Sequence, residues 1–475
     1  MPFLKTALLA AAGLLPAAPL YAQTAAPQPP MYPVAGYTAA VVSGPPQGLD
    51  NLVTSQVIEK FDLPQKHVVK DGDELTLDQC LSIALDQDPD LLASRFSAQA
   101  AQAALKGSKS AYYPAINAQV YAQKYGAPYT NPQDPYVTTQ QQKYTLGGGG
   151  ISLKQLLLDF GSRSGSIGAS SAGYKASLYD LENLATQIAR DIKQYYYDVI
   201  RAKRALDVNI ETVSQYEQHL AVAQAQFGQG SKPKYDVTKA ETDLSGAQLG
   251  LIRARNEYEL ARIRLNSAMF LTKPGRYSVR DTLDYTDYSI ALDDILNKAY
   301  ENRPDLKALA QQYAAAEFEV RQARSDYYPS FYASGAYNAA GSETPASQNW
   351  NAGLSLELNI FQGMKTRAAV ERGNARQNAL KAQLYSKGRD IYMEAQKSLL
   401  ALSEAEERIS NAAAQVKEAS ENLEIATVRY QTGISTPIEL TDATASYSDA
   451  KLQFITALYD YKIAQADIEK TMGSR

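Results

Sequence analysis

The chain has 475 residues and a formal net charge of −4, with 21% charged and 45% hydrophobic residues. This balance does not point to nucleic acid or to an acidic ligand as a partner. His67 and His219 lie far apart and Cys80 is the only cysteine, so the sequence contains no cluster with metal-ligand or catalytic spacing. We therefore expect no cofactor, no bound metal and no enzymatic activity.

The first 22 residues have the pattern of a secretory signal peptide. Lys5 precedes an apolar run over 7–15, and a plausible cleavage site lies before Gln23. An uncleaved anchor is the alternative, but about nine apolar residues are fewer than half of the ~20 that a spanning helix needs. No cysteine follows the site to carry a lipid. The pattern predicts export of the mature chain.

Residues 23–74 form the next predicted segment. Six prolines fall within 23–50, among Gln, Ala, Gly and Thr, and such a composition cannot bury a core. We expect this segment to be flexible or to lie along the rest of the chain.

The remainder of the chain contains an internal sequence repeat. The triplet PDL at Pro89 recurs at Pro304, and YYP at Tyr112 recurs at Tyr327, both at an offset of 215 residues. Further on the offset falls to 203, because GISL at Gly150 corresponds to GLSL at Gly353 and FGQG at Phe227 corresponds to YQTG at Tyr430. A period near 200 residues indicates a duplicated domain and not a solenoid repeat.

The fall in offset places twelve extra residues between the first pair of strands. The interval 125–142 is dense in Pro, Asn, Asp and Gly and predicts a long turn. We assign repeat 1 to 75–272, a connector to 273–288 and repeat 2 to 289–475. Each repeat is expected to contain a helix, a β-hairpin, a long helix and a final helix.

Helix boundaries follow from local signals. Thr76 and Gln79 have the spacing of a capping box, and Asp88 before Pro89 is a second start signal. Pro114 and Pro329 end the first helix of each repeat, because proline lacks the amide donor and crowds the preceding turn.

After each Tyr-Tyr-Pro the period of the sequence changes from 3.6 to 2. In repeat 2 the returning strand alternates apolar Ala352, Leu354, Leu356, Leu358 and Ile360 with polar or small Asn351, Gly353, Ser355, Glu357 and Asn359. In repeat 1 the outgoing strand alternates Ile116, Ala118, Val120 and Ala122 with Asn117, Gln119, Tyr121 and Gln123, and the returning strand over 147–157 contains four glycines. Those glycines lack the Gly-Lys-Ser/Thr ending of a phosphate loop.

These segments are near the ~10 residues of a transmembrane strand, although a soluble antiparallel sheet shows the same alternation. Trp350 and Tyr337 lie near strand ends, where interfacial aromatics are common in membrane proteins. Four strands cannot close a membrane barrel, since lipid tolerates no open edge. If the strands span a membrane, several chains must share one barrel.

Two proline-free stretches, 162–227 and 364–430, predict helices of ~100 Å each at 1.5 Å per residue. The helices that follow them repeat small and large residues every three or four positions, which is typical of a coiled-coil seam as well as of an ordinary bundle core. The two registers are Ala240, Leu244, Ala247, Leu251, Ala254, Tyr258, Ala261, Leu265 and Ala443, Tyr447, Ala450, Phe454, Ala457, Tyr461, Ala464, Ile468.

Taken in order, these motifs resemble the TolC family of outer membrane efflux and secretion ducts over residues 75–471. The resemblance is carried by LTLDQCLSIALDQDPDL, the two Tyr-Tyr-Pro helix ends, LLLDFG and NIFQG, and the pair QFGQGSKPKYDV and RYQTGISTPIELTDATASY. It implies a mainly α fold with transmembrane β: a duplicated long-helix coiled-coil tunnel, with four strands from each chain in a shared 12-stranded trimeric β-barrel.

The resemblance also implies a function and partners. A homotrimer in the cell outer membrane, in contact with outer membrane lipid and extending into the periplasm, would conduct substrates passively. It would engage a periplasmic adaptor (membrane fusion) protein and an inner membrane ABC or RND transporter. Nucleic acid is not an expected partner.

By the same resemblance, the candidate site lies at the turns after the long helices. Gly230 and Gly433 are the turn residues where an adaptor would dock. Glu439 and Asp442 match acidic rings at the periplasmic aperture, whereas acids in a first helical turn also simply favour the helix dipole.

Asp236 and Tyr430 match members of the network that holds the aperture shut. The family's best-known member has an arginine where this chain has Ser435. Lys232, Lys234 or Lys239 is the expected substitute.

Two other functions remain open at this stage. A periplasmic adaptor also contains long coiled-coil hairpins, but it has one hairpin flanked by lipoyl-like and β-barrel modules, whereas two strand hairpins lie between helices here. A purely structural coiled-coil protein would leave the alternating strands unexplained.

Overall fold

The computed structural model describes residues 67, 69–129, 140–271, 274–341 and 347–474. The expected signal peptide and most of the segment 23–74 lie outside the described residues. The described part belongs to one compact unit, Pro64–Arg475.

The two repeats contain the same sequence of long elements. In the first they are α2 (Leu77–Gln87), α3 (Pro89–Lys109), η1 (Ser110–Tyr112), β2 (Ala115–Tyr129), β3 (Gln140–Leu158), α4 (Ser162–Gly228) and α5 (Lys234–Ala268). In the second they are α6 (Leu292–Asn302), α7 (Pro304–Ser325), β5 (Ser330–Gly341), β6 (Ser347–Glu357), α8 (Lys365–Gln431) and α9 (Pro437–Thr471). The mainly α fold with a four-stranded sheet is therefore confirmed.

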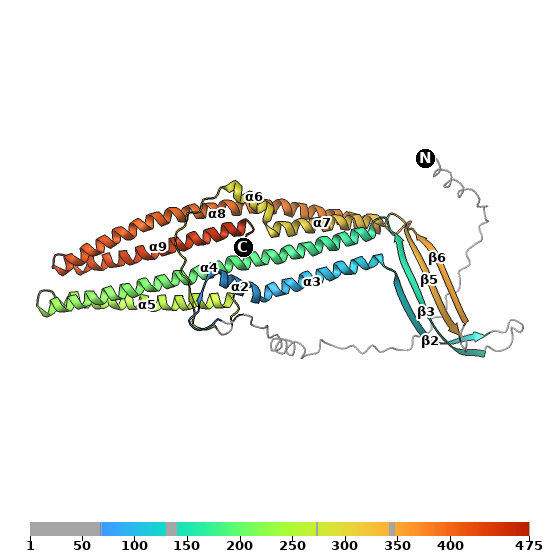
Figure 1. The fold of residues 1–475 in the computed structure, drawn as a ribbon, viewed down its shortest axis with the longest axis horizontal. Helices are drawn as coiled ribbons and strands as arrows, with labels where there is room; N and C mark the ends of the chain where they lie inside the picture. The colour runs from blue at the N-terminus through green and yellow to red at the C-terminus, as the bar shows by residue number, and fades with distance from the viewer. Residues whose placement is uncertain (1–66, 68, 130–139, 272–273, 342–346, 475) are drawn as a thin grey trace, which may run out of the picture. The chain divides into compact units, whose positions relative to one another are not determined.

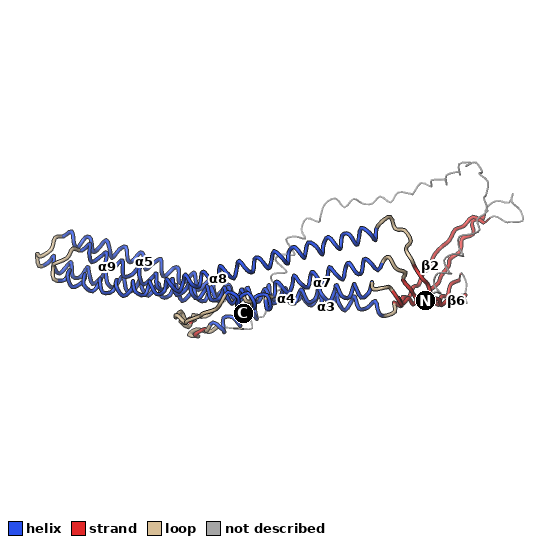
Figure 2. Tube along the Cα trace, turned by 90° about the horizontal axis from the view of Figure 1, so that it is seen from above, coloured by secondary structure: helices blue, strands red, loops and turns tan. Residues whose placement is uncertain are grey.

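The helices pack in two zones along the long helices α4 and α8. Near the sheet, α3 and α7 pack on α4, and α7 also packs on α8. In the other zone α5 and α9 pack on α4, and α9 packs on α8. The strands lie at one end of the helices and the α4–α5 and α8–α9 turns at the opposite end (Figures 1 and 2).

The predicted start signals are formed as expected. The amide of Gln79 donates to Thr76 Oγ1 at 3.4 Å, and the amide of Thr76 donates to Gln79 Oε1 at 2.9 Å, which completes the capping box. Asp88 Oδ1 accepts from the amide of Leu91 at 2.9 Å, ahead of the helix that Pro89 begins.

Each Tyr-Tyr-Pro marks the same change of structure. The amide of Tyr113 donates to the carbonyl of Ser110 at 2.9 Å, and the amide of Tyr328 donates to that of Ser325, also at 2.9 Å. Both bonds close a tight final turn just before the proline that prevents the helix from continuing. Strands β2 and β5 begin immediately afterwards.

The four long strands form an antiparallel sheet in the order β2-β3-β5-β6. Its register places Ala118, Ile151, Tyr337 and Trp350 in one row across all four strands. One face is thus apolar from strand to strand and is exposed. Its large members, with their exposed fractions, are Ile116 (66%), Val120 (89%), Ile151 (57%), Leu153 (38%), Tyr337 (50%), Trp350 (77%), Leu354 (80%) and Leu356 (57%).

The strand limits differ from the sequence prediction in two places. Strand β6 ends at Glu357, so Leu358 and Ile360 of the alternating run lie after it. Part of the predicted turn 125–142 is strand, because β2 continues to Tyr129 and pairs with β3 from Gln140. Extra residues of repeat 1 therefore lengthen its strands, since ladder pairing outweighs the turn preference of Gly and Pro.

The glycines of β3 allow close packing across the sheet. A Cβ at Gly148 would lie 2.8 Å from the ring of Tyr121, and one at Gly150 would lie 2.8 Å from the carbonyl oxygen of Tyr337. The glycines at these two positions thus leave room that neighbouring strands occupy.

The main core lies midway along the helices. Strand β1 (Glu74–Leu75) pairs in parallel with β4 (Ser278–Val279), so the end of the segment 23–74, expected to be flexible or to lie along the chain, lies against the connector. The hydroxyl of Tyr196 on α4 donates to the carbonyl of Arg280 at 2.7 Å, and that of Tyr461 on α9 donates to Thr286 at 2.7 Å. These bonds fasten the connector to both repeats.

The predicted seam faces inward. On α9 its residues Ala443, Ala450, Ala457, Tyr461, Ala464 and Ile468 are buried. On α5 only Ala261 and Leu265 are buried, and the other seam residues are half-buried. No helix within the described residues combines the length and the apolar composition needed to cross a bilayer.

Candidate functional site

The two turns at the end away from the sheet have the same backbone. Gly230 and Gly433 have φ of +73° and +78°, the left-handed region that glycine enters without strain. The amide of Gly230 donates to Phe227 at 2.9 Å, and the amide of Gly433 donates to Tyr430 at 3.0 Å. The geometry of a helix C-terminus at both glycines is therefore confirmed, and their role in docking stays a prediction.

The structure brings Asp236 of α5 and Tyr430 of α8 together, and both are buried, with exposed fractions of 4% and 3%. Tyr430 packs against Leu440 of α9, and the ammonium of Lys232 lies 5.8 Å from the centroid of its ring. Burial raises the pKa of the Tyr430 hydroxyl, and the negative charge of Asp236 raises it further. These residues connect the turn of repeat 1 to the long helix of repeat 2.

The two other predicted acids lie apart from this buried group. Glu439 and Asp442 are exposed in the first turns of α9. The amide of Glu439 donates to Thr436 Oγ1 at 3.4 Å, and Arg429 Nη2 lies 3.8 Å from Glu439 Oε2. Both side chains of that ion pair are about half exposed, so it contributes little to stability. Glu439 and Asp442 are thus both accessible to solvent, and their role at an aperture stays a prediction.

Ser435, at the position of the missing arginine, is buried, and its hydroxyl has no hydrogen-bond partner among the described residues. Of the expected substitutes, Lys239 pairs with Asp243 on the same helix, while Lys232 lies over Tyr430. The carboxylate of Asp243 also accepts a hydrogen bond of 2.7 Å from the hydroxyl of Thr441. Lys239 therefore takes part in a link between α5 and α9.

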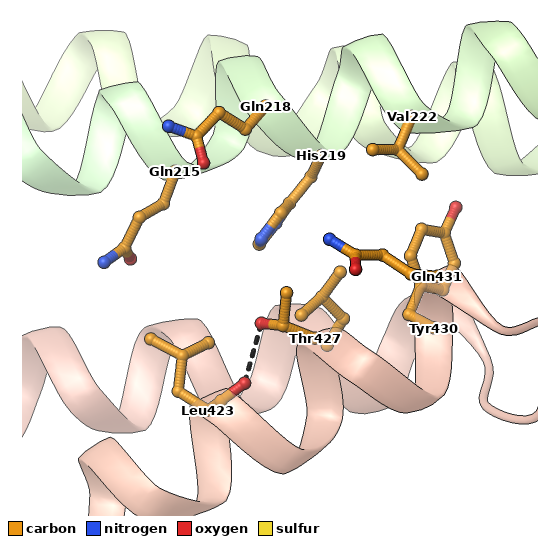
Figure 3. Close-up of a pocket in the computed structure, with 9 residues that line it drawn as sticks. Gln215, Gln218, His219, Val222, Leu423, Thr427, Tyr430 and Gln431 are labelled. Carbon is orange, nitrogen blue, oxygen red and sulfur yellow. Dashed lines mark hydrogen bonds between the residues drawn. The ribbon is translucent and has the colours of Figure 1, made fainter.

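His219 is a residue of this region that the sequence did not single out. It projects from α4 toward α8 and lines a cavity of about 230 Å³ (Figure 3). The other lining residues are Gln215, Gln218, Val222, Leu423, Thr427, Tyr430, Gln431 and Leu440. The cavity is amphipathic and includes the predicted gate residue Tyr430.

Burial also changes the acid–base properties around His219. Its ring meets that of Tyr216 edge-on, with centroids 5.7 Å apart. Burial lowers the pKa of His219 while Asp243 opposes the shift, and burial raises the pKa of Tyr216 to about 12. At neutral pH the half-buried imidazole is accordingly mostly uncharged.

Sequence signals for the residues that were missed here are weak. Asp243 has the i,i+4 spacing of a helical ion pair with the expected substitute Lys239. Tyr216, His219 and Thr441 have no local pattern, because their contacts depend on how helices of different repeats pack.

Comparisons with known proteins agree with this architecture. The outer membrane efflux protein family matches residues 80–269 and 295–474. Outer membrane protein OprJ of Pseudomonas aeruginosa is 21% identical over 412 residues, which are 84% of each chain. Outer membrane protein TolC of Escherichia coli is 24% identical over 298 residues, 59% of this chain and 60% of TolC.

Solved structures show the same fold. A structure of CusC, described in terms of folding and transmembrane channel formation, has a TM-score of 0.75 at 18% identity and covers 86% of this chain and 94% of its own. The CmeC outer membrane channel of Campylobacter jejuni has a TM-score of 0.74 at 18% identity, covering 84% and 85%. The two solved structures are described as channels, and the two sequence relatives are named as outer membrane proteins.

Proposed function

The chain belongs to the outer membrane efflux protein family and resides in the outer membrane, and from this premise we propose that it is the exit duct of a tripartite efflux or type I secretion system. In this role it conducts substrates passively from an inner membrane transporter to the exterior. The duct itself carries out no chemistry.

The observation that carries the proposal is the exposed apolar face of the sheet at one end of ~100 Å helices. Large side chains such as Val120 and Leu354 are 89% and 80% exposed there, and a lipid bilayer is the solvent that accepts such a face. The opposite face carries Asn, Gln, Ser and Lys side chains suited to a water-filled passage.

The same sheet supports a homotrimer. Within the described residues β2 and β6 each pair on one side only, so each chain has two open edges. Because hydrocarbon cannot satisfy their backbone groups, neighbouring copies must pair with them. Three copies supply 12 strands, which is a closed barrel of ordinary size.

The opposite end supplies the regulated aperture and the docking turns. Three copies of exposed Glu439 and Asp442 form acidic rings that favour cations. Buried Asp236 and Tyr430 hold the helix ends together. A periplasmic adaptor docks at the Gly230 and Gly433 turns and links the duct to an ABC or RND transporter.

Planar-bilayer recording tests the aperture. Replacing both Glu439 and Asp442 with Ala should weaken block by multivalent cations by roughly tenfold or more, because paired charges in a narrow site act together. The matched control replaces Glu407 and Glu418, exposed acids farther along α8, and should leave block unchanged. Equal block in both variants would remove Glu439 and Asp442 from the aperture.

Cell fractionation tests the assembly. The duct should be found in the outer membrane fraction and migrate as a trimer on unboiled gels. A monomer in the soluble periplasm would overturn the proposed function.

A further inference from the structure

Basic side chains gather where the helices meet the sheet. Helices α3 and α7 end at this level, and α4 and α8 begin there (Figure 1). The segments 106–113, 159–163, 321–328 and 361–376 contain nine basic residues and three acidic ones, although the whole chain has a net charge of −4. The basic residues are Lys106, Lys109, Arg163, Arg321, Arg324, Lys365, Arg367, Arg372 and Arg376, and the acidic ones are Asp159, Asp326 and Glu371.

Three of these cations already have acidic partners. Arg163 pairs with Asp159, Arg367 with Glu371, and Arg376 with Glu319. The other six are exposed and form no ion pair within the described part of the chain. We call these six the basic collar: Lys106, Lys109, Arg321, Arg324, Lys365 and Arg372.

An open groove concentrates part of this charge. It lies between α7 and α8, has a volume of about 640 Å³, and is lined by Glu319, Gln322, Ala323, Asp326, Lys365, Ala369, Arg372, Gly373 and Arg376. Glu319 forms an ion pair with Arg376, whose Nη1 lies 2.9 Å from Glu319 Oε2. Asp326 is thus the only acid lining the groove that has no ion-pair partner among the described residues. Two basic residues of the groove, Lys365 and Arg372, also have none.

Aromatic side chains lie between the collar and the sheet. Tyr112, Tyr113, Tyr327, Tyr328 and Phe361 follow or precede the strands directly and are 54%, 73%, 54%, 55% and 77% exposed. From the strands toward the helices the surface is therefore apolar, then aromatic, then basic. A bilayer has the matching order of hydrocarbon, interface and headgroup phosphate.

The direction of the side chains on α8 favours the same partner. Cα–Cβ bonds in a helix tilt toward its N-terminus, and α8 begins at the sheet. Lys365 and Arg372 consequently lean toward the membrane end, and long basic side chains extend their charged groups to such an interface.

A second copy of the chain cannot neutralise the collar. In these four segments every copy carries the same excess of basic residues, and two of their three acids are already paired. The compensating anions must come from outside the protein.

We propose that the basic collar binds the phosphates of anionic phospholipids in the periplasmic leaflet of the outer membrane. The inference rests on the proposed function, in which the sheet spans that membrane. The collar would fix the depth of the barrel in the membrane and keep the helices perpendicular to the membrane plane.

Native mass spectrometry of the detergent-solubilised trimer, titrated with phosphatidylglycerol or phosphatidylcholine, tests the collar. The wild type should bind phosphatidylglycerol at least about tenfold more tightly, given several basic residues each worth about fivefold near an anionic surface. The variant Arg324→Gln/Lys365→Gln/Arg372→Gln should lower that ratio below about threefold. The control Lys381→Gln/Arg389→Gln/Lys417→Gln removes three exposed cations farther along α8 and should keep it.

Several results would overturn the proposal. They are an unchanged ratio in the collar variant, an equal loss in the control, competition by inorganic phosphate at the same concentration as the lipid, or collar-variant trimers that dissociate while their lipid preference is kept. If the triple variant does not fold, the wild type still decides, because its preference must fall severalfold between 50 and 500 mM salt. The unboiled gel is run first, so loss of the trimer itself separates failure of the proposed function from failure of the collar.

Discussion

The two repeats follow the same backbone path but treat equivalent residues differently. Tyr430 is 3% exposed, whereas its counterpart Phe227 is 46% exposed. Asp236 is buried, and its counterpart Glu439 faces solvent. Duplication thus repeats the architecture, while individual substitutions place a buried aromatic ring in repeat 2 and a buried carboxylate in repeat 1, and the charge of Asp236 acts on the hydroxyl of Tyr430.

The same contrast appears at the start of α3 and α7. Asp90 in the PDL of repeat 1 is exposed, with no ion pair among the described residues. Asp305 in the PDL of repeat 2 accepts from Arg303 at 2.8 Å and from Lys387 at 2.7 Å, and Arg303 also reaches Glu394 at 2.6 Å. Only repeat 2 has a partly buried charge network at this position.

The largest effect is expected from a substitution that breaks this charge network. Arg303 is 6% exposed, and Arg303→Ala would leave Asp305 and Glu394 with a missing partner, so we expect a loss of about 3–5 kcal/mol. Asp90→Asn, in repeat 1, should change stability by less than about 0.5 kcal/mol. Trimer melting, followed on unboiled gels over a temperature series, measures both. Equal melting of the two variants would contradict the contrast.

The network also predicts a pH dependence. Burial alone would raise the pKa of the Asp305 carboxyl, but Arg303 and Lys387 outweigh it and lower the pKa below the ordinary 3.8. A carboxyl whose folded pKa is lowered stabilises the fold above its ordinary pKa and loses that contribution as pH falls through the folded value. The difference between the wild type and Asp305→Asn should therefore persist at pH 5 and shrink below pH 3.8.

The second effect concerns equivalent glycines in the sheet. A Cβ at Gly150 would press on the carbonyl oxygen of Tyr337, whereas one at Gly353 meets nothing within 4 Å. Gly150→Ala should cost about 1–3 kcal/mol through overpacking, while Gly353→Ala should be close to neutral. Refolding yield into detergent micelles, read from the fraction of trimer, distinguishes them. Similar yields would mean that β3 and β5 separate without cost.

The third effect tests the turns. Tyr430→Ala would remove a buried ring of α8 that packs against α9, at a cost of about 3 kcal/mol in packing. If Tyr430 holds the aperture closed as proposed, single-channel conductance should rise severalfold. Phe227→Ala removes an exposed ring and should leave conductance near the wild-type value. A rise in both variants would show that general loosening, and not the buried contact, controls the opening.

The features that could be predicted from the sequence are those that depend on short-range interactions. The limits of α4 and α8, the capping box at Thr76 and the breaks at Pro114 and Pro329 were predicted, because each depends on neighbours within one or two turns. The alternation of the strands predicted an apolar face for the same reason, but it left open whether that face is exposed or packs on a core.

Contacts between repeats were not predictable in this way. The Asp243–Thr441 bond joins residues 198 positions apart, and Tyr216 reaches the carbonyl of Thr441 across 225. Their partners depend on the rotation and offset of packed helices, which no local pattern specifies. The strand pairing beyond Tyr125 was missed because its Gly and Pro residues favour turns until a partner strand is present.

The smallest expected effect separates His219 from its counterpart Asn422, which has no charge to gain. Burial lowers the pKa of His219 from 6.5, so the packed turn region binds fewer protons than a loosened one. Stability that depends on a neutral imidazole is complete above pH 6.5 and declines as pH falls below it toward the lowered value. Asp243 with Lys239, Tyr216 and Tyr430 are the titratable groups facing this site, and none of them reverses the sign of this pH dependence.

Open probability of the wild-type channel should rise by about two- to fivefold from pH 7.5 to pH 5.5, within the tenfold per pH unit that one proton allows. His219→Gln should flatten this rise, whereas His67→Gln, which alters an exposed pair with Asp86, should retain it. A full pH response in His219→Gln would assign the proton uptake to the acids of α5 and α9 instead.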